Sequence, residues 1–310
     1  MADAALHDAP RNVANKAANK SLARWLISGP PLLYLIVFFV LPCLIMVLAS
    51  FRSPGDYGGL APLHDADGKL DLSWDNYSRF FEDFIYARVF LKSLLYALTT
   101  TVVCLVMAYP LATLIAHSSK KYRDLLLLLV ILPFWSNFLI RVYAWMIILG
   151  PQSALSRGLN SVLGLFGIEP VTLLFSGFAV IVGLVYVHLP FMVLRLYANL
   201  EKHDPALLDA AQDLGANAWQ RFWRVTFPLS LPGVFAGAAL VFIPALGIFA
   251  VSDILGGTGG IMIGNVIKQQ LLETRDWPFG SVLSIGLTAA ALLVAGLAAW
   301  VARPRREAHA

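Results

Sequence analysis

The residues that could do chemistry lie in two places, a polar stretch between the fourth and fifth long apolar runs and a few side chains at the edges of those runs. In the polar stretch, Asp204 can cap the free amides of a helix that begins at Pro205, and Gly215 can end that helix in a left-handed conformation. Asn217 and Gln220 have the spacing of a capping box, which predicts a second helix. Two short amphipathic helices joined by a glycine are typical of a docking element for another protein, although a helix lying in the lipid headgroups fits the same pattern.

Each of the two predicted helices has one apolar face. In the first, aliphatic side chains share one side, and in the second a mostly aromatic stripe recurs at helical spacing. The first face consists of Leu207, Leu208, Ala211 and Leu214, and the second of Trp219, Phe222, Trp223, Thr226 and Phe227. Pro228 and Pro232 come next, and we expect them to turn the chain back toward the next apolar run.

Asp253 is the acidic side chain best placed to bind a cation, because it lies at the outer end of an apolar run. Ionisable groups near membrane depth are costly and often functional, although an aspartate in the watery interface costs little. A cation that passes such a place needs carboxylates and aromatic faces that hold it weakly enough to release it. The aromatic residues that could supply such faces, or that simply occupy the interface as Trp and Tyr commonly do, are Trp135, Tyr143, Trp145 and Trp277.

Arg141 is the one charged residue inside the long apolar runs. A fixed cation would repel a cationic solute, so we expect a structural role, with the side chain snorkelling outward or paired with a carboxylate. The alternative is a gate, in which Arg141 exchanges partners between two states of the protein.

The sequence lacks the patterns of enzyme sites. The phosphate-binding pattern G-x-x-x-x-G-K-[ST] is absent, since the only Gly-Lys pair, Gly68-Lys69, has Leu63 where the first glycine should be. H-E-x-x-H and G-x-S-x-G are absent, the six histidines are scattered, and Cys43 and Cys104 both lie in apolar runs. We therefore predict that the chain is not an enzyme, holds no metal or cofactor, and depends on a partner for any ATP hydrolysis.

The composition places the chain in a membrane. Of its 310 residues, 58% are hydrophobic and only 14% are charged, against about 25% charged in ordinary soluble domains. The net charge of +4 is too small, and the basic residues are too dispersed, for a nucleic acid partner. We predict an all-α integral membrane protein, because backbone amides left unpaired in lipid cost several kcal/mol and the alternating pattern of a membrane β-barrel is missing.

Six apolar runs are long enough to cross the bilayer as helices, which takes roughly 20 residues. They are Pro31–Phe51, Ser93–His117, Leu125–Leu149, Leu174–Leu194, Gly233–Ser252 and Ser281–Val301. The first run comes after a basic leader but exceeds the roughly 7–15 apolar residues of a cleaved signal, so we expect an uncleaved anchor. Prolines interrupt four runs and should permit bending there, namely Pro110, Pro133, Pro190 and Pro244.

The distribution of Lys and Arg orients these runs. With the amino terminus in the cytoplasm, fourteen of the 23 basic residues fall in inside segments and eight in outside segments. Both termini are then cytoplasmic. We expect a disordered tail over 1–24, the first span and a periplasmic loop over 25–92, a five-helix core over 93–301 that contains the polar stretch at 199–231, and a carboxyl-terminal tail over 302–310.

The polar stretch resembles the signature loop of ABC importer permeases, in which Glu-Ala-Ala-x-x-x-Gly precedes Ile-x-Leu-Pro. The matching residues are Asp209, Ala210, Ala211 and Gly215, then Val225, Phe227 and Pro228. The departures are Asp209 for Glu, Val225 for Ile and Phe227 for Leu. The resemblance implies the type I ABC importer permease fold, with a cytoplasmic coupling helix seated in a cleft of the ATPase subunit. The shorter Asp209 side chain leaves a specific carboxylate contact open.

Further segments are similar to the spermidine/putrescine transport permeases, the B-type subunit of that system. They are Leu126–Ile148, Val185–Leu194, Ala245–Gly257 and Ile263–Ser284. This resemblance implies a bacterial inner-membrane permease subunit of an ATP-driven, binding-protein-dependent importer of polyamines. Its partners would be a second permease, an ATPase dimer and a periplasmic polyamine-binding protein.

Other functions fit parts of the same sequence. An importer of this class could carry iron, sulfate, phosphonate or an opine, but an anionic solute calls for basic residues along the route, and the apolar runs offer only Arg141. A stand-alone secondary transporter would need coupling ionisable residues within the spans, which are nearly absent. A membrane enzyme would need a catalytic constellation, and the sequence shows none.

Overall fold

A computed structural model describes residues 28–64 and 70–301, and within these ranges the regular structure is helical apart from two isolated bridges. This confirms the all-α prediction. Six helices are long and apolar enough to cross a membrane, as predicted. The tails expected at 1–24 and 302–310 lie outside the described residues.

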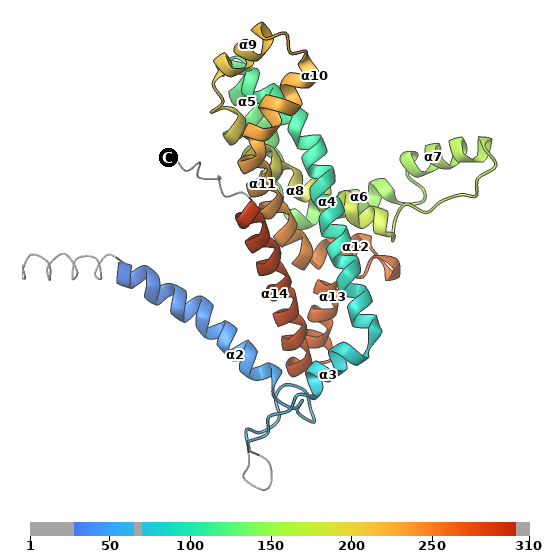
Figure 1. Ribbon diagram of the computed structural model, residues 1–310. Helices are drawn as coiled ribbons and strands as arrows, with labels where there is room; N and C mark the ends of the chain where they lie inside the picture. The colour runs from blue at the N-terminus through green and yellow to red at the C-terminus, as the bar shows by residue number, and fades with distance from the viewer. Residues whose placement is uncertain (1–27, 65–69, 302–310) are drawn as a thin grey trace, which may run out of the picture.

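The first apolar run forms one helix over Ser28–Ser50, which includes the π-helical turn η1 (Ile36–Val40) and α2 (Leu41–Ser50). It leans away from the other helices (Figure 1), and its contact with them runs through α14 (Trp277–Val301). The short helix α3 (Asp75–Glu82) comes next, and the Arg79 guanidinium pairs with Asp276 at 2.9 Å, which fastens this loop to the start of α14.

Three helices form the centre of the bundle: α4 (Phe84–His117), α8 (Gly177–Leu200) and α11 (Phe227–Gly247). Small residues let them approach closely, as is common where helices pack in membranes. A Cβ on Gly237 would lie 2.6 Å from the Met192 sulfur, and one on Gly233 would lie 2.6 Å from Asn199 Cβ. The buried core between them includes Cys104, Ala108, Ala112, Met192, Leu196, Val234 and Val241.

The third apolar run is not one helix, so the prediction of a continuous span over Leu125–Leu149 was wrong. It is divided into α5 (Lys120–Ile131), the 3-10 turn η2 (Leu132–Trp135) and α6 (Phe138–Leu149), and α7 (Ala154–Leu165) comes after them. Pro133 cannot donate an amide and Asn137 starts a new helix by accepting a hydrogen bond from the Leu139 amide at 2.8 Å. The third membrane-crossing candidate is Phe138–Leu165, and α7 projects to one side of the bundle (Figure 1).

The other three prolines predicted to interrupt apolar runs lie within continuous helices. Pro110, Pro190 and Pro244 lie within α4, α8 and α11. The expectation that Pro228 and Pro232 turn the chain was also wrong, because α10 (Ala218–Arg221), the π-helical turn η3 (Phe222–Thr226) and α11 form one helix over Ala218–Gly247. Pro228 comes directly after the π-helical turn η3, and Pro232 lies inside α11, so neither proline ends the helix.

The fifth apolar run ends earlier than expected, at Gly247 rather than Ser252. Short elements then reverse the chain before α14: α12 (Ala250–Leu255), η4 (Thr258–Gly260), α13 (Ile263–Lys268) and η5 (Gln269–Glu273). At the opposite end of the bundle from α3 lie α9 (Pro205–Asp213) and α10 (Figure 1). There Arg123 pairs with Glu201 at 2.7 Å, which joins the start of α5 to the end of α8.

Candidate functional site

The loop between α8 and α11 starts as its sequence predicts. Asp204 caps α9, since its Oδ1 accepts a hydrogen bond from the Ala206 amide at 3.0 Å, and Pro205 occupies the first position of the helix. Gly215 has φ +81°, a left-handed conformation that suits glycine. Its amide donates to the Gln212 carbonyl at 2.8 Å and the Ala216 amide donates to the Ala211 carbonyl at 3.0 Å. These bonds close the end of α9.

The second helix of the loop starts with the predicted capping box. The Asn217 side chain accepts from the Gln220 amide at 2.8 Å, and the Gln220 side chain accepts from the Asn217 amide at 3.0 Å. Arg221 then donates from Nη1 to Gln212 Oε1 at 2.8 Å, which ties α10 to α9. Because both helices are capped at their first turns and are joined by a side-chain hydrogen bond, the loop has a defined structure.

The signature residues of this loop are open to solvent. Asp209, Ala210 and Pro228 are exposed and Ala211 is half-buried. The apolar face of α9 is also uncovered, with Leu207 at 47% and Leu214 at 88% exposure. An ordered helix pair that leaves leucines in contact with water has the character of a surface that a partner protein covers.

An aromatic cluster connects this loop to the helix bundle. Phe222 and Trp223 make edge contacts with ring centroids 5.1 Å apart, and Tyr109 of α4 meets Phe222 at 5.2 Å. The Tyr109 hydroxyl lies 2.9 Å from Ser230 Oγ on α11. We name the rings Tyr109, Trp219, Phe222, Trp223 and Phe227 the aromatic cluster. Because these rings connect the loop to both helices, a displacement of the loop would also displace α4 and α11.

At the far end of α11, Asp253 is held in a network of polar side chains. The Lys268 ammonium lies 2.8 Å from Asp253 Oδ2, and the Asn265 side-chain amide donates to Oδ1 of the same carboxylate. Glu273 lies 3.6 Å from the Lys268 ammonium on another side. The Asp253 and Lys268 side chains are 34% and 30% exposed, so both remain accessible to water. Asp253 is therefore not a free carboxylate in this state.

The lysine in this network has the surroundings expected of a bound ammonium group. Its Nζ lies 5.8 Å from the centre of the Phe249 ring, within the range of a cation–π contact. The hydrogen bond and the charge of Asp253 raise the pKa of Lys268 above its ordinary value, and Glu273 adds to this. A raised pKa keeps the amine protonated throughout the physiological range.

Sequence reasoning missed Lys268, Asn265 and Phe249. The sequence does contain a signal for this pair. The Gly256–Gly260 segment, with four glycines and one threonine, predicts a bend between Asp253 and Lys268. A chain reversal of this kind can bring opposite charges on its two sides together.

The structure does not bring the four predicted aromatic residues to Asp253. Trp135 is 76% exposed, and Trp145 packs against Tyr186 of α8 with ring centroids 5.6 Å apart. Trp277 donates its indole N–H to the Leu271 carbonyl at 3.2 Å, and Tyr143 is exposed on α6. The aromatic ring facing the Asp253 network is that of Phe249.

Arg141 is half-buried, and its guanidinium carbon lies 5.5 Å from the centre of the Phe134 ring. Among the described residues it forms no ion pair, and the expected structural role, by snorkelling or by pairing with a carboxylate, stays a prediction. Over the same residues, no group of three or more His, Cys, Asp or Glu side chains is arranged to hold a metal ion.

Comparison with known proteins identifies the family. Residues 85–306 match the model of the binding-protein-dependent transport system inner membrane component. The chain is 44% identical over 255 residues to the spermidine/putrescine transport system permease protein PotB of Haemophilus influenzae, covering 82% of this chain and 85% of the relative. It is 45% identical to the protein of the same name from Escherichia coli, covering 82% and 89%.

A solved structure supports the same fold. A chain of a bacterial alginate ABC transporter, in complex with an alginate-bound periplasmic protein, superposes with a TM-score of 0.71 at 18% identity, covering 93% of this chain and 96% of that one. The family match extends over more than half of the chain, and six apolar helices make it a multi-pass membrane protein. The chain therefore belongs to the family of inner membrane components of binding-protein-dependent transport systems, and it is a permease subunit of an ABC importer rather than an enzyme.

Proposed function

We propose that this chain is the membrane-spanning permease subunit of an ATP-driven importer of polyamines, spermidine and putrescine above all. The observation that carries the substrate class is the 44–45% identity to spermidine/putrescine permeases over 82% of the chain. The partners that we propose are a second, related permease, an ATPase dimer in the cytoplasm, and a periplasmic polyamine-binding protein. Both termini of the chain would lie in the cytoplasm.

The loop around Asp209–Gly215 is the proposed docking element for the ATPase. Its exposed leucines, together with Asp209 and Ala210, offer an apolar surface with a carboxylate beside it. When ATP-driven closure of the ATPases displaces α9, the link from Arg221 to Gln212 and the aromatic cluster pass the movement to α4 and α11. That movement would open the cavity between the two permeases toward the cytoplasm.

The Asp253 network is the proposed contact for an ammonium group of the substrate. The Lys268 side chain ends in a primary ammonium, the same group that ends a polyamine, and it lies against two carboxylates and the Phe249 ring. A polyamine ammonium can take its place by exchange, so that Asp253 is never left without a cation. Because both side chains are partly exposed, water screens their attraction and the pair is weak enough to permit exchange.

Uptake of labelled spermidine and putrescine in cells that lack this chain tests the proposal, with an unrelated amino acid as the control solute. We expect selective loss of polyamine uptake, restored by the wild type but not by Asp253→Asn. The matched control is Asp276→Asn, which removes the charge from the other outer ion pair, with Arg79. Unchanged polyamine uptake in the deletion strain, with no redundant system present, would refute the substrate. Equal rescue by Asp253→Asn and Asp276→Asn would refute the proposed role of Asp253 and would leave the proposed substrate unaffected.

A further inference from the structure

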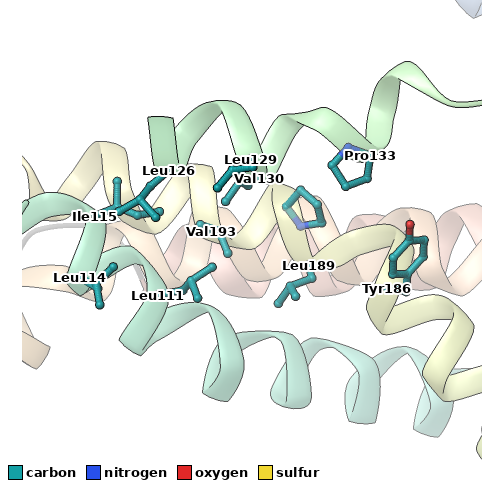
Figure 2. Close-up of a pocket in the computed structure, with 11 residues that line it drawn as sticks. Leu111, Leu114, Ile115, Leu126, Leu129, Val130, Pro133, Tyr186, Leu189 and Val193 are labelled. Carbon is teal, nitrogen blue, oxygen red and sulfur yellow. The ribbon is translucent and has the colours of Figure 1, made fainter. Parts of the chain in front are cut away.

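A cavity of about 350 Å³ lies between α4, α5 and α8, apart from the loop and from the Asp253 network. Figure 2 shows its lining, with Ile115 and Leu126 toward one end and Pro133 and Tyr186 toward the other. Apart from the Tyr186 hydroxyl, the side chains that line it are hydrocarbon. They come from α4, α5, η2 and α8: Leu111, Leu114, Ile115, Leu126, Leu129, Val130, Pro133, Leu189, Pro190 and Val193. A polyamine would find no carboxylate in it.

At one end of this cavity, two of its lining residues are joined by a basic turn. Ile115 is in the last turn of α4 and Leu126 is in the second turn of α5, so the segment that joins them borders this end. It carries Lys120 and Lys121, both exposed and, within the described residues, in no ion pair. Arg123 is neutralised by Glu201 at 2.7 Å, and Asp124 is the one other acidic side chain in this turn.

The turn also presents the amino-terminal end of α5, a helix of 12 residues whose cap residue Ser119 makes no side-chain hydrogen bond to it. The free amides of such a helix end favour a negative charge, and they add to the two lysines. An apolar cavity that ends at a positively charged helix start matches a molecule with a hydrocarbon chain and an anionic head. Basic pockets between membrane helices bind the head groups of anionic lipids in this way.

We propose that this cavity, together with Lys120 and Lys121 in the turn that joins α4 to α5, binds one acyl chain and the phosphate of an anionic phospholipid. The lining favours a flexible hydrocarbon chain over a protein segment, because its side chains offer no polar group other than the Tyr186 hydroxyl to pair with a peptide backbone. The bound lipid would fill the space that the broken third run leaves beside α4 and α8.

Native mass spectrometry of the purified full chain tests this site, with phosphatidylglycerol and phosphatidylcholine of identical acyl chains as probes. Two lysines near a lipid surface contribute roughly 1 kcal/mol each. We therefore expect the double variant Lys120→Gln/Lys121→Gln to weaken phosphatidylglycerol binding about 30-fold and to leave phosphatidylcholine binding unchanged. The matched control, Arg88→Gln/Arg157→Gln, removes two exposed charges from α4 and α7, away from the basic turn, and should bind both lipids as the wild type does.

A second pair of variants tests the apolar part. Leu129→Trp places a large side chain in the cavity and should reduce binding of both lipids, whereas Leu128→Trp, on a neighbouring residue that does not line the cavity, should not. If Leu129→Trp fails to fold, Leu129→Phe gives a smaller obstruction. Equal affinity of the wild type for the two lipids would overturn the proposal, as would equal binding by the lysine variant and its control. Loss of the lipid on assembly with the other subunits would show that a protein covers the site, and would overturn it as well.

Discussion

At the scale of single residues, Lys268 tests the proposed exchange of ammonium groups at Asp253. If the substrate binds this carboxylate, the lysine paired with it at 2.8 Å competes for the same site, so its removal should make the substrate bind more tightly and leave more slowly. We expect Lys268→Gln to lower the KM for spermidine about 2- to 5-fold, in proportion to a partly exposed ion pair, and to lower the maximal rate of uptake. Uptake kinetics in whole cells measure both parameters.

The control for this prediction is Arg157→Gln, an exposed cation on α7 that belongs neither to the Asp253 network nor to the loop after α8. It should leave both parameters unchanged. A KM for the Lys268 variant equal to that of the wild type would contradict the exchange of ammonium groups, whatever happened to the maximal rate.

Gly215 is the residue whose backbone conformation the loop depends on. No atom outside its neighbours approaches within 4 Å of an added Cβ, so a substitution there acts through the backbone and not through crowding. At φ +81°, alanine should cost roughly 1–2 kcal/mol. Proline should cost more, because it cannot adopt this φ and loses the bond to the Gln212 carbonyl.

We therefore expect ATP-coupled uptake to fall in the order wild type, Gly215→Ala, Gly215→Pro, with protein levels checked by immunoblot. Gly286→Ala is the control, since Gly286 also has open space around it but lies within α14. Unchanged coupling in Gly215→Pro, with expression intact, would exclude this turn from the coupling pathway.

At the scale of elements, the link between the loop and the bundle depends on Phe222. This ring is half-buried and contacts Tyr109 of α4, whereas Trp219 in the same cluster is 70% exposed. Phe222→Ala should lower the free energy of unfolding by about 2 kcal/mol, below the roughly 3–5 kcal/mol of a fully buried phenylalanine because the site is only partly enclosed. Thermal unfolding of the purified chain in detergent measures the change. Trp219→Ala should shift it much less, and an equal shift for both would show that the two rings do not differ in packing.

The sequence predicted the elements well where local chemistry decides them. Asp204, Gly215 and the Asn217–Gln220 box set the limits of α9 and α10 through bonds within a few residues. Proline was a poor guide, because its effect depends on the residues after it. Pro133 stands at a real break because Asn137 is ready to cap the next helix, whereas Pro228 and Pro232 lie within a helix that continues. The Asp253–Lys268 pair could not be predicted, because it depends on how the chain reverses between α12 and α13.

At the scale of the whole molecule, the fold is set by the pattern of apolar helices more than by particular residues. A permease structure with 18% identity superposes over 93% of the chain. Helices in lipid satisfy their own backbone bonds, so their packing depends mainly on small residues at the contacts and tolerates wide variation elsewhere. The functional sites that we propose lie at the two ends of the bundle, in the loop that carries α9 and in the network around Asp253.

The orientation of these two ends is set by the basic residues and gives a prediction for the molecule as a whole. The loop with α9 and the turn with Lys120 lie at one end, joined by the Arg123–Glu201 pair, so they must face the same side of the membrane. The positive-inside rule predicts that this side is the cytoplasm, which is the orientation that we propose.

In a variant with Cys43 and Cys104 replaced by alanine, we expect a cysteine at Tyr57, which is 98% exposed, to react with a membrane-impermeant maleimide in intact cells. A cysteine at the exposed position Lys202 should react only after the membrane is permeabilised. Uptake by the variant without its native cysteines serves as the control for folding. Labelling of both positions from outside, or the reverse pattern, would contradict the orientation. Labelling of Lys202 from outside would also exclude contact between the loop with α9 and an ATPase in the cytoplasm, because that loop and Lys202 lie at the same end of the bundle.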